Sequence, residues 1–155
     1  MWAQTLRLWC CVGVALALGC RHPSKARSTE RDVAAALVLG EDWIEIAADP
    51  PLRAHGRRPE LVLHHSPELT LTREAAARGA LYSPRLDQQI RLEGELLSRD
   101  GSVLRLASGG LSPGRVAMKP ASGEVPRDLV VEGLRLRSSV PFAVSRLEWC
   151  GSPAR

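Results

Sequence analysis

The chain of 155 residues is poor in aromatic side chains and cysteine, and it has no long apolar run. Aromatic residues make up only 4% of it, so a core must be built chiefly from Leu, Val, Ile and Ala. Its four cysteines show no Cys-x-x-Cys or Cys/His spacing of the kind that binds structural zinc. No apolar stretch reaches the roughly 20 residues that a membrane-spanning helix needs.

The amino end has the pattern of a secretory signal peptide. Arg7 and the amino terminus are positive, residues 8–18 are apolar, and the small residue Gly19 follows. We therefore expect residues 1–19 to be removed after export. An uncleaved amino-terminal anchor is the alternative.

The sequence "LALGC", residues 16–20, resembles the lipobox of bacterial lipoproteins. The resemblance covers only the first twenty residues, and Ala17 stands where that family most often has Leu. It implies cleavage between Gly19 and Cys20, with acyl groups such as palmitate on Cys20. In Gram-negative members of that family, an Asp directly after the acylated cysteine retains the lipoprotein at the inner membrane. This chain has Arg21 at that place, so in a Gram-negative host the resemblance implies location at the outer membrane, facing the periplasm.

An acylated cysteine suits a protein without a spanning helix. One acyl chain binds membranes only marginally, whereas two or three on one residue give a stable anchor. With Cys20 acylated, Cys150 is left as the other cysteine of the mature chain. If Cys20 is not acylated, a Cys20–Cys150 disulfide is the alternative, since exported proteins usually pair their cysteines.

The mature chain is predicted to form one domain. Residues 20–32 are polar and are expected to be the lipidated amino terminus and a flexible tether, with a single β-rich domain over residues 33–155. Arg7 is the only charged residue before Gly19, so the mature chain has 20 basic and 17 acidic side chains, a net charge of +3. Nucleic-acid binding requires a clustered basic face, so we expect no nucleic-acid partner.

The second half of the chain gives the strongest strand patterns. Residues 90–96 alternate apolar and charged, and Asp100-Gly101 then provides a hairpin turn. Gly133 predicts a bulge or bend within an extended segment. Near the carboxyl end, large apolar residues occur at every second position except for one slip, an extra residue between Val144 and Leu147; they are Phe142, Val144, Leu147 and Trp149. Short strands at this spacing predict a mainly β fold, a small antiparallel β-sandwich or jelly roll with at most one or two short helices.

The first half is more ambiguous. Residues 33–39 fit either a strand or a helix. A strand around Ile44 is expected to stop at residues 49–51, Asp-Pro-Pro, with a loop over residues 52–60. Two short extended pieces are broken at Ser66-Pro67, and residues 73–80 are the best helix candidate.

The closing stretch "LVVEGLRLRSSVPFAVSRLEW", residues 129–149, distantly resembles the last hairpin of galactose-binding-like jelly rolls. It contains no catalytic or binding motif of that group. The resemblance therefore implies architecture only.

Few residues indicate chemistry. His64 and His65 are adjacent, so on a strand they point to opposite faces and do not readily share a metal ion. Glu93 and Glu95 share one face, as the carboxylates of a glycosidase would, but their alternation with apolar residues is typical of a solvated sheet face. Residues 53–58, "RAHGRR", are a basic stretch that is expected to be a solvated loop; contact with anionic lipid or an acidic partner is the alternative.

Other motifs of catalysis are missing. Ser66 beside His65 lacks a nucleophile elbow, and Gly109-Gly110 and Gly114 lack the lysine of a phosphate loop. We predict no catalytic residue, no cofactor and no metal site.

Three functions of different class remain. The first is a membrane-anchored envelope lipoprotein that acts as a binding or assembly module for an envelope protein or glycan. The second is a carbohydrate-binding module, which Trp43 and Tyr82 exposed in one groove would favour. The third is an envelope hydrolase, which a pocket holding His64 or His65 beside a carboxylate would favour.

Overall fold

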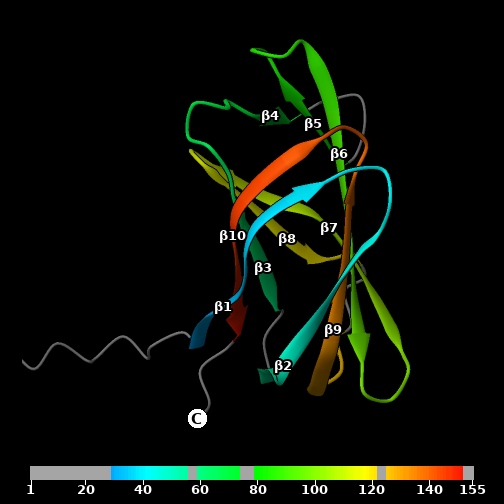
Figure 1. Ribbon diagram of the computed structural model, residues 1–155. Helices are drawn as coiled ribbons and strands as arrows, with labels where there is room; N and C mark the ends of the chain where they lie inside the picture. Colours follow the sequence, from blue (N-terminus) through cyan, green and yellow to red (C-terminus); the bar gives the residue numbers. More distant parts are fainter. Residues whose placement is uncertain (1–28, 56–58, 74–78, 122–124, 152–155) are drawn as a thin grey trace, which may run out of the picture.

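The structure is a computed structural model that describes residues 29–55, 59–73, 79–121 and 125–151. Within these ranges all regular structure is β-strand (Figure 1). The strands are β1 (Thr29–Leu39), β2 (Ile44–His55), β3 (Glu60–His64), β4 (Thr72–Arg73), β5 (Ala80–Ser83), β6 (Gln88–Ser98), β7 (Val103–Ser112), β8 (Arg115–Pro120), β9 (Asp128–Ser138) and β10 (Phe142–Gly151). The predicted mainly β fold is confirmed.

All strand pairs are antiparallel. The order β1-β10-β3-β8-β7-β6 continues through β9 to β2, so one sheet curls around the core into a sandwich that is nearly closed into a barrel. β5 and β4 extend the sheet from the first part of β6. β1 and β2 are the two ends of this path (Figure 1). There the guanidinium of Arg31 in β1 donates hydrogen bonds to the backbone carbonyls of Asp49 and Pro50 in β2.

The core is aliphatic, as the composition predicts. Leucines predominate among the fully buried side chains. In β10, the alternating set Phe142, Val144, Leu147 and Trp149 is buried, and the predicted slip lies between Val144 and Leu147. Ala36 of β1 lies opposite this slip with a φ of +48°. Both strands thus adjust so that apolar side chains keep facing inward, where their burial stabilises the fold.

The predicted hairpin turn joins β6 to β7. Gly101 has a φ of +84°, and its N–H donates to the carbonyl of Ser98 at 3.0 Å. The N–H of Ser98 donates to the carbonyl of Ser102 at 2.9 Å, which closes a three-residue loop with a left-handed residue in third place. Asp100 does not share the positive φ; its carboxylate accepts the N–H of Ser102 at 2.9 Å.

The path of β2 corrects two expectations. The strand does not stop at residues 49–51 but runs on to His55, so residues 52–55 are strand and not loop. Its pairing with β9 shifts between Ala47 and Leu52, which places Pro50 and Pro51 in an irregularity where no ladder bond is required of them.

Gly133 marks the opposite side of the same irregularity. The pairing of β9 with β6 also shifts beside this residue, as the predicted bulge requires. A Cβ atom at position 133 would lie 3.4 Å from the carbonyl oxygen of Ile46. The glycine therefore allows β2 to pass close to β9.

Residues 33–39, whose pattern fits either a strand or a helix, form part of β1. β1 begins at Thr29, so residues 29–32 of the expected tether belong to the sheet, which corrects that boundary. The break at Ser66-Pro67 is confirmed, but of the second expected extended piece, residues 68–72, only Thr72 belongs to a strand, β4. The predicted helix over residues 73–80 falls largely on residues 74–78, outside the described ranges; Arg73 ends β4 and Ala80 begins β5.

Candidate functional site

The outer face of β2, β9, β6 and β7 has a row of alternating charges. Glu45, Arg135, Glu95 and Arg105 stand opposite one another in register. Arg135 Nη2 lies 2.6 Å from Glu95 Oε2, while the Arg135–Glu45 and Arg105–Glu95 pairs are at 4.0 Å. Opposite charges on facing strands each stabilise a sheet by roughly 0.2–1 kcal/mol. The row also fixes four charged side chains in space.

A second row contains the aromatic residue Trp43. Arg137 and Glu93 face each other across β9 and β6, and Arg137 Nε donates to Glu93 Oε2 at 2.6 Å. The half-buried indole of Trp43, just before β2, lies 4.5 Å from the Arg137 guanidinium and 5.7 Å from that of Arg135. Cation–π contacts of about 0.5–1 kcal/mol each help to hold the ring on the sheet.

These side chains line a groove. A cavity of about 320 Å³ is bordered by Trp43, Glu93, Gly94, Glu95, Arg105, Leu106, Ala121 and Arg137. A second cavity of about 240 Å³ is bordered by Glu41, Arg91, Glu93, Arg137, Ser138 and Ser139. Since both have Glu93 and Arg137 in their walls, they adjoin. We call the two together the Trp43 groove.

The arrangement that would favour a carbohydrate-binding module, Trp43 and Tyr82 exposed in one groove, is not found. Trp43 lines the groove, but Tyr82 is not among the lining residues. The Tyr82 hydroxyl donates to the carboxylate of Asp87 beyond β5. The groove therefore offers one aromatic ring.

Glu93 and Glu95 do project from one sheet face, as predicted. Each is bonded to an arginine of β9, Glu93 to Arg137 and Glu95 to Arg135. The face was expected to be solvated, which fits Glu93, 38% exposed, but not Glu95, whose side chain is only 13% exposed. A glycosidase needs carboxyl groups that face a scissile bond.

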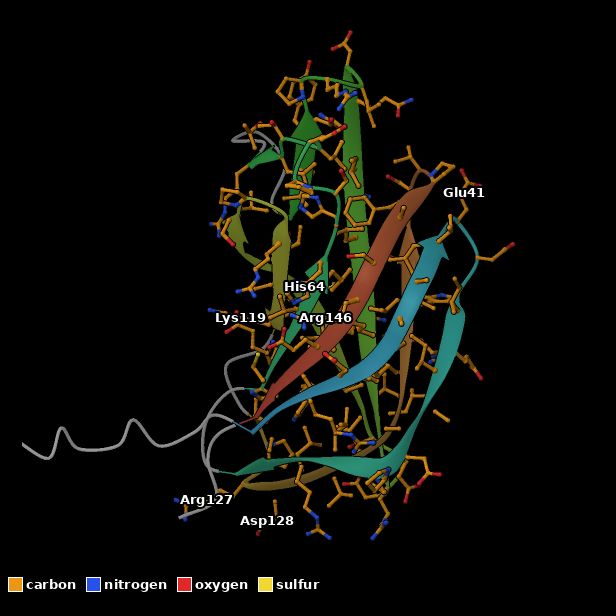
Figure 2. All side chains as sticks on the ribbon, turned by 60° about the vertical axis from the view of Figure 1, so that its left-hand side comes forward. Glu41, His64, Lys119, Arg127, Asp128 and Arg146 are labelled. Atoms are coloured by element: carbon orange, nitrogen blue, oxygen red, sulfur yellow. The ribbon has the colours of Figure 1, made fainter. Side chains whose placement is uncertain are left out.

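A second polar cluster lies on the outer face of β3 and β10. The Glu148 cluster consists of His64, Arg146, Glu148 and Cys150. His64 Nε2 lies 2.6 Å and Arg146 Nη2 lies 3.0 Å from Glu148 Oε2. Cys150 Sγ lies 3.7 Å from Glu148 Oε1. Figure 2 shows His64 and Arg146 close together, and the separation of Arg146 Nη2 from His64 Nε2 is 3.1 Å.

Glu148 is a buried carboxylate, with its residue 7% exposed. Burial acts to raise the pKa of Glu148. The hydrogen bond from His64 and the charges of Arg146, His64 and Arg115 outweigh it, so the pKa is lowered below its ordinary value. This carboxylate is thus held as an anion that binds β3 to β10.

His65 lies on the opposite side of β3. Its ring is packed against Phe142, with centroids 5.6 Å apart, and Nδ1 lies 2.8 Å from the carbonyl oxygen of Ser66. Desolvation by burial lowers the pKa of His65. Nδ1 therefore carries the proton that it donates to Ser66, and Nε2 is buried with no partner among the described residues.

The predicted divergence of the two histidines is confirmed. A cavity of about 450 Å³ next to the Glu148 cluster is lined by Asp32, Glu60, Val62, Arg115, Arg146, Glu148 and Cys150, but neither histidine lines it. The Nε2 atom of His64 is directed to Glu148 and Arg146 rather than to the cavity. Within the described ranges, no three His, Cys, Asp or Glu side chains are placed to hold a metal ion.

Other predicted sites lie partly outside the structure. Gly19 and Cys20 fall in residues 1–28, which are not described. Of the basic stretch 53–58, residues 56–58 are not described, and residues 53–55 belong to β2. Gly109 and Gly110 lie within β7, at a shift in its pairing with β8.

Comparisons with known proteins assign no family. No family model, no curated protein and no solved structure matches the chain. No helix in the described residues is long and apolar enough to span a membrane.

Sequence reasoning missed the Trp43 groove and the Glu148 cluster. The groove had a signal in the sequence. Charged residues alternate with uncharged ones in "RLEGE", residues 91–95, and in "RLR", residues 135–137, and when these two strands pair, the glutamates of one face the arginines of the other. The Glu148 cluster had a weaker signal, a carboxylate between the core residues Leu147 and Trp149.

Proposed function

We propose that this chain is an exported lipoprotein, anchored through acyl groups on Cys20, whose β domain is a binding module at the membrane surface. The lipobox-like sequence at residues 16–20 carries the anchoring half of this proposal. In a Gram-negative host, Arg21 favours the outer membrane.

The position of β1 supports a domain held close to the bilayer. The first strand begins at Thr29, nine residues after Cys20. Nine residue steps span at most roughly 30 Å when fully extended. The domain is therefore kept within a few nanometres of the anchor, which suits recognition of a ligand or partner in the envelope.

The edge strands β1 and β2 are poor sites for a partner strand, and the remaining edge strand, β4, has only two residues. In β2, Pro50 and Pro51 have no N–H to donate, and Arg31 occupies the carbonyl of Pro50. In β1, a pairing shift beside Val33 and the positive φ of Ala36 interrupt a regular edge. Proteins protect edge strands with such prolines, charges and bulges. We therefore assign binding to a sheet face and to the Trp43 groove.

The anchoring half is tested by metabolic labelling with an alkyne analogue of palmitate. The wild-type chain and Cys150→Ser, a matched change at the other cysteine of the mature chain, are expected to take up label. Cys20→Ser is expected to take up none and to remain uncleaved. Labelling and processing of Cys20→Ser would refute the lipoprotein proposal.

The binding half is tested by photocrosslinking in intact envelopes. A photoreactive residue at Arg105, in the groove, is compared with one at Val38, which is 65% exposed on the edge strand β1. We expect an adduct from position 105 and none from position 38. Adducts from position 38 alone would place binding at the edge.

A further inference from the structure

We propose that the Trp43 groove binds an uncharged, hydroxyl-rich oligosaccharide, with one sugar ring against Trp43 and its hydroxyl groups bonded to Glu93 and Arg137. The inference rests on the proposed binding function and specifies its ligand. It does not depend on the lipid anchor.

The charge balance of the groove selects an uncharged ligand. Its walls have three carboxylates, Glu41, Glu93 and Glu95, and three guanidinium groups, Arg91, Arg105 and Arg137. The closest of them are already paired, Glu93 with Arg137 at 2.6 Å. The positive and negative side chains are equal in number, so the groove has no net charge that would favour an anionic or a cationic ligand.

The atoms of Arg137 and Glu93 that are not used in their ion pair favour a ligand with hydroxyl groups. Arg137 uses Nε and Nη2 on Glu93 Oε2, so within the described residues Arg137 Nη1 and Glu93 Oε1 have no partner. A donor and an acceptor are thus left on one ion pair. A hydroxyl donates one hydrogen bond and accepts others. Two neighbouring hydroxyls of a sugar satisfy this pair, one donating to Glu93 and the other accepting from Arg137.

The part of the Trp43 ring that the guanidinium groups of Arg137 and Arg135 leave uncovered provides the apolar surface that a sugar ring also needs. The C–H groups of a pyranose ring form an apolar face, and an indole ring offers a broad flat area with few rotatable bonds. Arg137 and Arg135 hold this ring in place before any ligand arrives. A ring fixed in advance loses less conformational entropy on binding.

The size of the groove suits a short chain of sugars. The cavity at Trp43, about 320 Å³, is at the lower end of the roughly 300–1,000 Å³ of ligand pockets. The adjoining cavity, about 240 Å³, adds Ser139, whose exposed hydroxyl accepts the N–H of Arg91 at 2.9 Å and keeps its own proton for a ligand. With one sugar ring at Trp43, the adjoining cavity is left for the next ring of the chain.

The test is a titration of the full chain, purified from membranes in mild detergent, followed by tryptophan fluorescence and calorimetry. Probes are cellotetraose and the tetramer of N-acetylglucosamine as neutral sugars, a sulfated heparin tetrasaccharide, and an uncharged Ser/Gly-rich peptide. Trp149 is only 3% exposed, so a change in emission within the domain reports on Trp43. We expect a neutral tetrasaccharide to bind with a Kd below about 1 mM, and the sulfated sugar and the peptide to bind at least tenfold more weakly.

Variants locate the binding. Trp43→Ala and Arg137→Lys are expected to lower affinity at least about tenfold, and Trp43→Phe to retain part of it. Arg99→Lys is the matched control, because Arg99 makes an equally short 2.6 Å bond to Glu132 outside the groove. Calorimetry reports on Trp43→Ala, and an unchanged melting temperature shows that this variant is folded. The proposal is overturned by tightest binding of the sulfated sugar or the peptide, by no binding of either neutral sugar at about 10 mM, or by affinity that Trp43→Ala leaves intact.

These failures differ from a failure of the proposed function. A chain that crosslinks through position 105 but binds no sugar is still a binding module, with another ligand. A chain without acylation at Cys20 that binds sugar through Trp43 retains the inference and loses the anchor.

Discussion

Replacing Glu148 by Gln removes the anion on which the Glu148 cluster depends. The side chain is 9% exposed and accepts bonds from His64 at 2.6 Å and from Arg146 at 3.0 Å. Hydrogen bonds to a charged group contribute about 1.5–3 kcal/mol each, and glutamine retains one acceptor oxygen. We expect Glu148→Gln to lower the free energy of unfolding by about 2 kcal/mol at pH 7, which lowers Tm by about 6–10 °C in a domain of this size.

The pH dependence separates this cause from a general packing defect. The pKa of Glu148 is lowered in the folded state, so its stabilisation is complete above its ordinary value of 4.5 and is lost as the pH falls through the lowered pKa. The difference in Tm between the wild type and Glu148→Gln is therefore expected to shrink as the pH falls below 4.5.

Thermal unfolding followed by circular dichroism measures both effects. Glu132→Gln is the control, because Glu132 accepts a bond of the same 2.6 Å length from Arg99 but is 49% exposed. An exposed pair contributes about 0–1 kcal/mol, so Tm should move little. Equal losses of Tm in Glu148→Gln and Glu132→Gln, or a loss in Glu148→Gln that is the same at pH 7 and pH 3, would show that the Glu148 anion does not stabilise the fold.

Three further predictions concern the Gly101 turn, the pKa of His65 and zinc binding. Gly101→Val forces a β-branched residue to a φ of +84° and should lower the free energy of unfolding by about 1 kcal/mol or more, measured by urea denaturation; an unchanged midpoint would count against the turn. Because desolvation lowers its pKa, His65 should titrate by NMR below its ordinary value of 6.5, so folding stability should fall as the pH drops below 6.5; titration at or above 6.5 would contradict its burial. Calorimetric titration with Zn²⁺ should show no stoichiometric submicromolar binding, whereas such binding, lost in a His64→Ala/His65→Ala double variant, would revive a metal site.

The parts of the fold that depend only on neighbouring residues in the sequence were predicted correctly. The turn at Gly101 and the inward set Phe142, Val144, Leu147 and Trp149 follow from backbone preference and alternation. The continuation of β2 past Pro50 did not, because proline ordinarily ends a strand. That strand persists because its pairing with β9 resumes at Leu52.

The candidate site was harder to predict than the fold. Trp43 meets Arg137, and His64 meets Glu148 84 residues along the chain, so neither contact leaves a local signature. Only strand order and register place these residues on one face. The alternating charges of β6 and β9 were visible, but their pairing was not.

The most direct test of the anchored binding module is the mass of the mature chain isolated from membranes, together with mass spectrometry of its amino-terminal peptide. We expect a chain that begins at Cys20 and carries a diacylglyceryl group on the thiol and an acyl group on the amine. A chain that retains residues 1–19, or one that begins at Cys20 without acyl groups, would contradict it.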